Sequence, residues 1–363
     1  MFGPVLQSML EGELDSHLGY QKYERNGGSN SRNGHSKKTV ETSAGEIELE
    51  IPRDREGTFE PQAVKKHQRD VSGIEEKVIS MYAKGMSTRD ISSHLGEIYG
   101  IEASAEMISK ITDRVLPEVR EWQSRQLEEK YAVVFLDAVH YHVRDEGQVV
   151  KKAVYIALGV RLDGRKDVLG MYVGANEGAK YWLGVLNNLK SRGVKDILIC
   201  CVDGLTGFPE AIEAVFPQTD VQRCIIHQIR SSTRFVTYKD LKAFSRDLRP
   251  VYRANTQDEA WDKLLGFEKA WGAKYPSAVK SWKDNWNELT TYFRYPPELR
   301  RLIYTTNTIE GFNRQLRKVT KTRSAFPSDE ALLKLLYLVC HEEMDRAHAE
   351  LGAYSQPNTH PLP

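Results

Sequence analysis

Residues 131–226 alternate between short apolar runs and amphipathic segments, and this alternation limits the possible folds more than any other feature. Three apolar runs come first, "YAVVFLD", "KKAVYIALGV" and "KDVLGMYVGA". A helical segment, the apolar run "DILICCVDG", a short helix and the strand-like "DVQRCII" follow. The first two connections are short enough for antiparallel hairpins, and the later ones have the length of crossovers. The pattern therefore predicts an α/β domain built on a mixed sheet.

The predicted order, strand-strand-strand-helix-strand-helix-strand, is that of the ribonuclease H-like core. The next segment has helical periodicity and four tryptophans, so we expect a mostly α-helical insertion at about residues 228–300. We place the whole catalytic domain at residues 126–345 and a C-terminal tail at residues 346–363.

The first 70 residues combine three different patterns. Residues 5–23 have the spacing of an amphipathic helix. Residues 24–38 are rich in Gly, Asn and Ser with scattered bases, which predicts a flexible, solvated loop. The alternating "TVETSAGEIELEI" turns at Ser43–Gly45 and predicts a β-hairpin. We expect a separate N-terminal region at residues 1–70.

Residues 71–125 contain three short helical patterns joined by short turns. Ser87 and Ser104 stand at N-cap positions, and Gly100 precedes the third helix. This is the plan of a helix-turn-helix domain, whose last helix enters the DNA major groove. The alternative is a small helical bundle that only packs. In the DNA-binding reading, the exposed polar face of the third helix carries Ser109, Lys110 and Arg114.

Charge and cysteine content restrict the class of protein. The chain has 51 basic and 50 acidic residues, so it has no overall basic character, but local basic faces remain possible. The four cysteines have no paired spacing, and two are adjacent in an apolar run, which favours reduced, buried thiols over disulfides or a zinc cage. No segment has the layout of a signal peptide or the length of a membrane span. We expect a cytoplasmic, nucleoid-associated protein.

Two of the predicted strands end in an aspartate. Asp137 follows "VVFL" and Asp203 follows "ILICCV". Each alone is more typical of a surface turn or an ion pair. However, the first and fourth strands of the predicted sheet are neighbours, which would bring both carboxylates to the same rim. Two carboxylates that close repel each other unless a divalent cation lies between them.

The segment "TTNTIEGFNRQLRKVTKTR", residues 305–323, has one acid, Glu310, and five bases. On a helix, its apolar residues gather opposite Glu310, so docking of that side on the sheet would aim Glu310 at the rim. A solvated or capping glutamate is the alternative, and without the two aspartates it would be preferred. The bases that could line the approach of a polyanion are Arg314, Arg317, Lys318, Lys321 and Arg323.

Asp137, Asp203 and Glu310 together form a set of oxygen ligands with no His/Cys cluster, which selects Mg²⁺ or Mn²⁺ over zinc. Two such ions about 4 Å apart can activate a nucleophile and stabilise a leaving oxygen in phosphodiester attack. Cys224 and His227 form C-x-x-H without a second pair, so we expect no zinc site there. His140 and His142 are more typical of solvated strand positions.

Six motifs together resemble those of Mutator-type bacterial insertion-sequence transposases. They are "VVFLDAVHYHVR", "KAVYIALGV", "GANEGAKYWLGVL", "RGVKDILICCVDGLTGFPEAI", "VQRCIIHQIR" and "YTTNTIEGFNRQLRK". The upstream "SGIEEKVISMYAKGMSTRDI" and "GEIELEIPRDREGTFEP" are similar to the same family, so the resemblance spans residues 5–340. Members have a short segment ahead of the position of Met1.

The resemblance implies a Mg²⁺-dependent DDE transposase with Asp137, Asp203 and Glu310 as catalytic acids. It implies a basic position near DNA at Arg317, and an N-terminal region that binds the terminal inverted repeats of the element. It also implies double-stranded DNA as partner and a dimer or larger synaptic assembly. Cys224 and His227 match the family's C-x-x-H signature, and we group Asn307 and Asn313 with them as supporting positions.

Three interpretations remain open from the sequence. The first is an active transposase that cuts and joins DNA. The second is a catalytically inactive or truncated relative that acts as a DNA-binding protein. The third is a metal-dependent nuclease that cuts without joining. The intact acids argue against the second, and the helix-turn-helix region argues mildly against the third.

Overall fold

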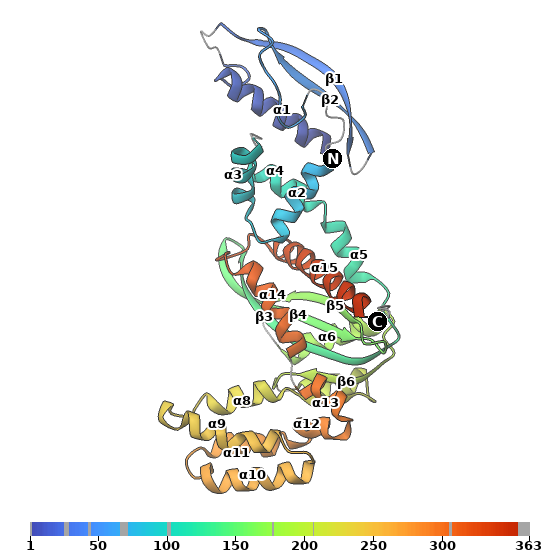
Figure 1. Cartoon of the computed structure of the whole chain (residues 1–363), viewed down its shortest axis with the longest axis vertical. Helices are drawn as coiled ribbons and strands as arrows, with labels where there is room; N and C mark the ends of the chain where they lie inside the picture. Colours follow the sequence, from blue (N-terminus) through green and yellow to red (C-terminus); the bar gives the residue numbers. More distant parts are fainter. Residues whose placement is uncertain are drawn as a thin grey trace, which may run out of the picture. The chain divides into compact units, whose positions relative to one another are not determined.

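The structure is a computed structural model, and it divides into two compact units, which are described separately (Figure 1). Unit 1 comprises Met1–Val119, Val319–Arg323 and Lys334–Val339; unit 2 comprises Arg120–Lys318, Ser324–Leu333 and Cys340–Pro363. The structure describes residues 2–24, 29–42, 45–65, 72–99, 103–175, 178–205, 207–304 and 307–354.

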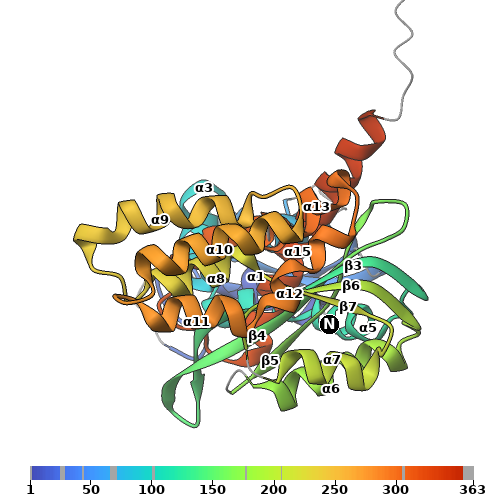
Figure 2. The ribbon, with the colours of Figure 1, turned by 90° about the horizontal axis from the view of Figure 1, so that it is seen from below.

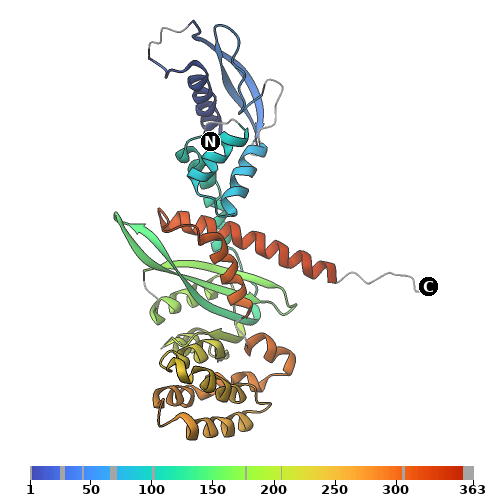
Figure 3. The same cartoon turned by 60° about the vertical axis from the view of Figure 1, so that its left-hand side comes forward.

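Unit 1 begins with helix α1 (Phe2–Leu18), which lies along a hairpin of β1 (Arg32–Thr42) and β2 (Gly45–Asp54) (Figure 3). The Gln7 side chain donates to the Glu50 carbonyl and accepts from the Glu50 N–H, so it joins helix to strand. The predicted hairpin is confirmed, although residues 43–44 of its turn lie outside the described residues.

The prediction of a loop over residues 24–38 is wrong in its second half, because β1 already begins at Arg32. Pairing with β2 continues from Thr42↔Gly45 as far as Arg32↔Asp54. These ladder hydrogen bonds satisfy the backbone of a segment whose Gly/Asn/Ser composition favours a loop. Residues 25–28 lie outside the described part of the chain.

Three short helices follow in unit 1, as predicted: α2 (Ser72–Ala83), α3 (Thr88–Tyr99) and α4 (Ala105–Asp113). Ser87 and Asp90 form a capping box, in which the Ser87 Oγ accepts from the Asp90 N–H and Asp90 accepts from the Ser87 N–H. Ser104 caps α4 by accepting from the Met107 N–H. Gly100 lies outside the described residues, and α5 (Leu116–Ser124) leads towards unit 2.

Unit 2 is built on a five-stranded sheet with the order β5-β4-β3-β6-β7. The β3–β4 and β4–β5 pairs are antiparallel, and the β3–β6 and β6–β7 pairs are parallel. The prediction of a mixed sheet with its first and fourth strands adjacent is therefore confirmed. The strands are β3 (Lys130–Asp145), β4 (Gln148–Val160), β5 (Lys166–Gly174), β6 (Asp196–Val202) and β7 (Asp220–Arg223).

The crossover helices α6 (Ala179–Ser191) and α7 (Phe208–Val215) lie side by side on the sheet (Figure 2). Trp182 is fully buried between them and the sheet, where its ring meets Tyr155 edge-on and packs against Phe208. These aromatic contacts fix the helices against β4, which pairs with the strand that carries Asp137.

Helices occupy the chain from Ile225 to Tyr304, somewhat beyond the predicted insertion at 228–300. The side chain of Gln222 on β7 anchors them, since it donates to the Leu289 carbonyl and accepts from the Tyr292 N–H. The elements are α8 (Ile225–Thr233), α9 (Tyr238–Tyr252), α10 (Gln257–Trp271), α11 (Pro276–Asp284), α12 (Trp286–Thr290), the 3₁₀ helix η1 (Thr291–Arg294) and α13 (Pro297–Tyr304).

The last two helices among the described residues are α14 (Asn307–Thr320), which carries the predicted third acid, and α15 (Asp329–Tyr354). The apolar side of α14 is buried as predicted, through Ile309, Phe312 and Leu316. Among the described helices, none combines the length and apolar character that a membrane crossing requires.

Candidate active site

Asp137 and Asp203 reach the same level of two neighbouring strands. In the parallel β3–β6 pair, Phe135 is opposite Cys201, and each aspartate follows two residues later. The expectation that Asp137 ends its strand is wrong, because β3 continues to Asp145. The reason is that β3 keeps pairing with β4 on its other side after β6 has ended. At Asp137, β3 therefore has no paired β6 residue on one side, while it still pairs with β4 on the other.

The electrostatics of Asp137 reflect this position. Burial raises the pKa of Asp137, and the nearby charge of Asp203 raises it further. The charge of His227, the N–H of Ala138 and the charge of Arg317 act in the opposite direction. The Ala138 N–H donates to the Oδ1 of Asp137 at 2.9 Å. The charge of Asp203 is thus close enough to disfavour ionisation of Asp137.

Asn313 on α14 contacts the second oxygen of Asp137. Its Nδ2 donates to the Asp137 Oδ2 at 2.6 Å, and the Asn313 residue is only 1% exposed. The Asn313 Oδ1 is also buried and has no hydrogen-bond donor within the described part of the chain. One helix therefore fixes the orientation of a carboxylate 176 residues upstream.

Glu310 lies one turn before Asn313 on the same helix, and its side chain is partly buried. One carboxylate oxygen, Oε1, lies 3.0 Å from a guanidinium nitrogen of Arg230 on α8. That oxygen is inaccessible to solvent and lacks a well-aligned hydrogen bond among the described residues. Arg230 is not among the site residues predicted from the sequence. The available signal is its spacing of three residues from His227, which places both on one helix face.

Cys224 and His227 shape the start of α8. The Cys224 Sγ caps the helix by accepting from the His227 N–H at 3.3 Å, and the Cys224 N–H donates to the Val202 carbonyl. The interaction with Cys224 and the charges of Asp137 and Asp203 raise the pKa of His227 to about 9, against partial burial. All four cysteines are free and buried, as predicted. The C-x-x-H motif thus places a cation beside the aspartates.

The predicted basic residues fall into two groups. Arg314, Arg317, Lys318 and Lys321 are exposed, as expected for a polyanion-facing side. Arg323 is partly buried, since its guanidinium donates to the Met86 carbonyl at 2.6 Å and covers the Tyr82 ring at 4.7 Å. Its expected place on the open basic face is therefore wrong, because an aromatic ring and a carbonyl in unit 1 hold it.

The third helix of unit 1 gives a similar division. Lys110 is exposed and pairs with Glu106 one turn away, at 3.0 Å. The Ser109 carbonyl accepts a hydrogen bond from the Thr112 hydroxyl. Arg114 pairs with Glu75, a buried carboxylate of α2, so its expected exposure is wrong. A buried carboxylate needs a counter-ion, and Arg114 supplies it. Among the supporting positions, the side chain of Asn307 lies outside the described residues.

The oxygen-rich donor set fits a hard divalent cation, since it offers three carboxylates and the unpartnered amide oxygen of Asn313. Over the described residues, however, no three His, Cys, Asp or Glu side chains are gathered closely enough to hold a metal ion. Glu310 instead forms an ion pair with Arg230 of α8.

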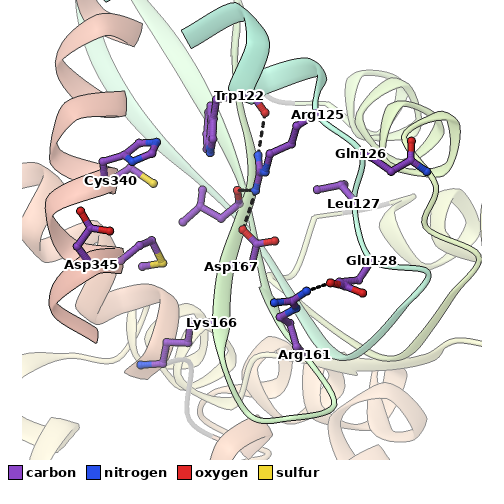
Figure 4. Close-up of a pocket in the computed structure, with 13 residues that line it drawn as sticks. Trp122, Arg125, Gln126, Leu127, Glu128, Arg161, Lys166, Asp167, Cys340 and Asp345 are labelled. Atoms are coloured by element: carbon purple, nitrogen blue, oxygen red, sulfur yellow. Dashed lines mark hydrogen bonds and ion pairs between the residues drawn. The ribbon is translucent and has the colours of Figure 1, made fainter. Parts of the chain in front are cut away.

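A separate cavity of about 560 Å³ lies elsewhere in unit 2 (Figure 4). Its charged walls are largely paired: Arg125 donates to Asp167 at 2.6 Å, and Arg161 pairs with Glu128. The Trp122 ring lies 5.1 Å from the Arg125 guanidinium. None of the residues predicted as functional lines this cavity, so it is not the candidate active site.

Comparison with known proteins assigns the family. The model of the Mutator family of transposases matches residues 2–349. The chain therefore belongs to the Mutator family of transposases, and transposition, a form of DNA recombination, is the function that this membership assigns. The resemblance seen in the sequence is confirmed.

Individual relatives are transposases of insertion sequences. The chain is 50% identical over 348 residues to the transposase of ISRM3 from Rhizobium meliloti strain 1021, covering 95% of this chain and 87% of the relative. It is 28% identical over 337 residues to the transposase of IS256 in Tn4001 from Staphylococcus aureus, covering 92% and 86%.

Among solved structures, a Drosophila P element transposase strand transfer complex is similar over 78% of this chain and 81% of that one. Its sequence identity is 10% and its TM-score 0.32. A likeness this weak supports no inference about the fold or the chemistry of the present chain.

Proposed function

We propose that this chain is a DDE-type transposase that cuts and joins DNA in a ribonuclease H-like core, with Asp137, Asp203 and Glu310 as its catalytic acids. The single observation that carries the proposal is the arrangement of the two aspartates. They lie at the same level of neighbouring parallel strands, and Asn313, one turn after Glu310, contacts Asp137 directly.

Asp137, Asp203 and Glu310 would hold Mg²⁺, or Mn²⁺, with two ions the expected number. When bound, such ions activate the attacking oxygen and stabilise the leaving one in phosphodiester displacement. For Glu310 to join the aspartates, it has to exchange its contact with Arg230. Arg230 then becomes a free cation at the edge of the site, where a DNA phosphate is its natural new partner.

The remaining residues of the site orient the Asp137 carboxylate and compensate the negative charge of the two aspartates. Asn313 fixes one oxygen of Asp137, and the Ala138 N–H fixes the other. His227 compensates part of the negative charge of the aspartates. The exposed bases of α14, Arg314 and Lys318 among them, can contact the phosphates of a polyanion.

We also propose that α2–α4 bind the terminal inverted repeats in the manner of a helix-turn-helix domain. Support comes from three short helices, two of them capped by Ser87 and Ser104, and from the exposed Lys110 on α4. Double-stranded DNA is then the partner of both units. Synapsis of two element ends calls for a homo-oligomer, with a dimer the smallest, working on DNA in the cytoplasm.

The test uses the purified full chain, a labelled duplex that carries one element end, a target plasmid and Mg²⁺. Joined products that disappear in Asp203→Ala and on addition of EDTA support the proposal. DNA binding without any cleavage by the wild-type chain would instead indicate an inactive DNA-binding relative. Cleavage that never yields a joined product would indicate a nuclease.

A further inference from the structure

Helix α9 carries a row of exposed bases on the side that faces away from its core. At 100° per residue, these bases and Tyr238 fall within an arc of about 100°. The buried residues Phe244, Leu248 and Val251 fall on the other side. The row extends for about 16 Å from Tyr238 to Arg249 at the rise of an α-helix. Its bases are Lys239, Lys242, Arg246 and Arg249, and we call it the α9 basic row.

The acids of the same helix neutralise one base of this row, Arg246, which pairs with Asp247. Asp240 and Asp247 lie roughly opposite Tyr238 on the helix. Asp240 is held by Lys274 and Tyr275, and Asp247 accepts from the Trp271 indole at 3.2 Å and from Arg246. Lys239, Lys242 and Arg249 have no ion-pair partner among the described residues.

Two large aromatic side chains stand exposed at the start of the row, in the elbow between α8 and α9. Phe235 is 73% exposed and Tyr238 is 94% exposed. The Arg234 guanidinium lies 5.6 Å from the centre of the Phe235 ring. Burying such rings is ordinarily favourable, so their exposure indicates a surface that another molecule covers.

The elbow is held in place from behind. The Thr237 N–H donates to the Tyr275 hydroxyl at 3.3 Å, and that hydroxyl donates to Asp240 at 2.5 Å. The Thr237 hydroxyl also bonds to Asp240 at 3.1 Å. The rings are therefore presented on a fixed turn, which reduces the entropy lost when a partner binds them.

The elbow continues from the candidate active site along a single helix. His227 and Arg230 of α8 face the acids, and Arg234 follows Arg230 by one turn, or about 6 Å. Positive charge thus runs from Glu310 through Arg230 and Arg234 to the α9 basic row. Figures 1 and 2 show α8 and α9 following each other in this order.

We propose that the α8–α9 elbow and the α9 basic row form a second DNA-binding surface, which takes the DNA next to the cut site. The bases contact phosphates, and Phe235 and Tyr238 stack on bases that become unpaired when the strands are opened there. The proposal rests on the proposed function of the chain. Duplex DNA offers a negative charge about every 1.7 Å along its axis, which suits a row of cations in which only Arg246 is paired with an acid of the same helix. Aromatic rings beside such cations are the usual platform for unpaired bases.

The charge component is tested by binding without chemistry, with the full chain in EDTA and a fluorescent duplex that carries one element end. Lys242→Glu/Arg249→Glu should weaken binding about tenfold or more and lower the slope of log affinity against log salt by about 2. The matched control is Lys263→Glu/Lys269→Glu on α10, whose exposed lysines directly follow Asp262 and Glu268 in the sequence. Equal slopes for the two variants would overturn the proposal.

The ring component is tested with the same duplex interrupted by a single-stranded gap at the cut site. Phe235→Ala and Tyr238→Ala should each weaken binding to the gapped probe by about tenfold and leave binding to the intact duplex nearly unchanged. Tyr238→Phe keeps the ring and should bind the gapped probe as the wild type does. Losses that are equal on both probes, or no loss at all, would contradict stacking.

Two further readouts separate this proposal from its alternatives. Asp203→Asn should bind with the wild-type salt slope and cut nothing, so failure of the catalytic assignment leaves the binding result intact. Light scattering compares the mass of each variant with that of the wild type. If the charge variants lose mass while their salt slope is unchanged, the surface binds a second copy of this chain and the DNA assignment is wrong.

Discussion

Helices α14 and α9 both turn a row of bases outward and an apolar side inward, yet they serve the molecule differently. The inner side of α14 includes a polar contact, Asn313 to Asp137, and its first turn carries Glu310. The fully buried residues of α9 are apolar, and its two acids bond to Tyr275, to Trp271 and to Arg246 of α9 itself. Positive charge alone therefore does not identify a catalytic helix. We base the different roles that we propose for the two helices on what their inner sides contact, a carboxylate of the sheet for α14 and other helices for α9.

The largest expected effect is on cleavage, which we assign to α14, as opposed to DNA binding, which we assign to α9. Glu310→Gln should lower cleavage and joining by more than about a hundredfold, because even outer-shell partners of metal ligands contribute ten- to a hundredfold. Its DNA affinity in EDTA should stay at the wild-type value. Lys242→Glu should do the reverse, with weaker binding and normal cleavage at saturating DNA. Cleavage assays and anisotropy on the same preparations measure both.

A result in which Glu310→Gln cuts normally would remove α14 from the active site. The control variant is Gln315→Glu, which changes charge at a nearby, partly exposed position of the same helix. It should retain both cleavage and most of the DNA affinity.

The sequence predicts the meeting of the two aspartates and the buried side of α14. Two apolar strands that each run into an aspartate, in an order that makes them neighbours, predict the level at which Asp137 and Asp203 meet. The spacing of Ile309, Phe312 and Leu316 predicts the buried side of α14. These features depend on local pattern and on the rules of strand connection, which act within a few residues of each position.

The next largest effect concerns a contact that pattern does not reveal. Asn313→Ala should lower cleavage by about ten- to a hundredfold, in the range seen when partners that orient a ligand are removed. The reason is that the Asp137 carboxylate loses the donor at 2.6 Å that fixes its orientation. Asn313→Asp should be at least as damaging, since it replaces the donor to Asp137 by another carboxylate.

Arg314→Ala on the exposed side of the same helix provides the comparison. It should reduce DNA affinity and leave cleavage at saturating DNA unchanged. Equal cleavage by Asn313→Ala and wild type would show that Asn313 only fills space.

Other features could not be predicted, because they depend on residues far away in the chain. Residues 32–38 have the composition of a loop, and only pairing with β2 makes them a strand. Strand β3 continues past Asp137 because it still pairs with β4 after β6 has ended. Arg323 follows four exposed bases in sequence, and only the positions of Tyr82 and Met86 show that it packs in unit 1.

Arg323 therefore gives a prediction about stability, the third in size. Arg323→Ala should lower the free energy of unfolding by about 1–3 kcal/mol, through loss of the hydrogen bond to the Met86 carbonyl and of the contact with Tyr82. Arg314→Ala should change it little, because that side chain is exposed. Denaturant titration of both variants measures the difference. If Arg323→Ala instead weakens DNA binding with unchanged stability, the residue belongs with the exposed bases of α14.

The smallest effect tests how the α9 elbow is held. Hydrogen bonds from Lys274 and Tyr275, which outweigh slight desolvation, lower the pKa of Asp240 to about 2 from its ordinary 3.8. A carboxylate with a depressed pKa in the folded state stabilises that state fully above its ordinary pKa, and the stabilisation is lost as the pH falls towards 2. Asp240→Asn should therefore flatten the decline in melting temperature between about pH 4 and pH 2. Lys274→Gln should reproduce part of this change, since it removes the first of the two donors. An unchanged pH profile in both variants would mean that the elbow does not depend on Asp240, and the rings of Phe235 and Tyr238 would then lack the fixed turn that stacking on DNA requires.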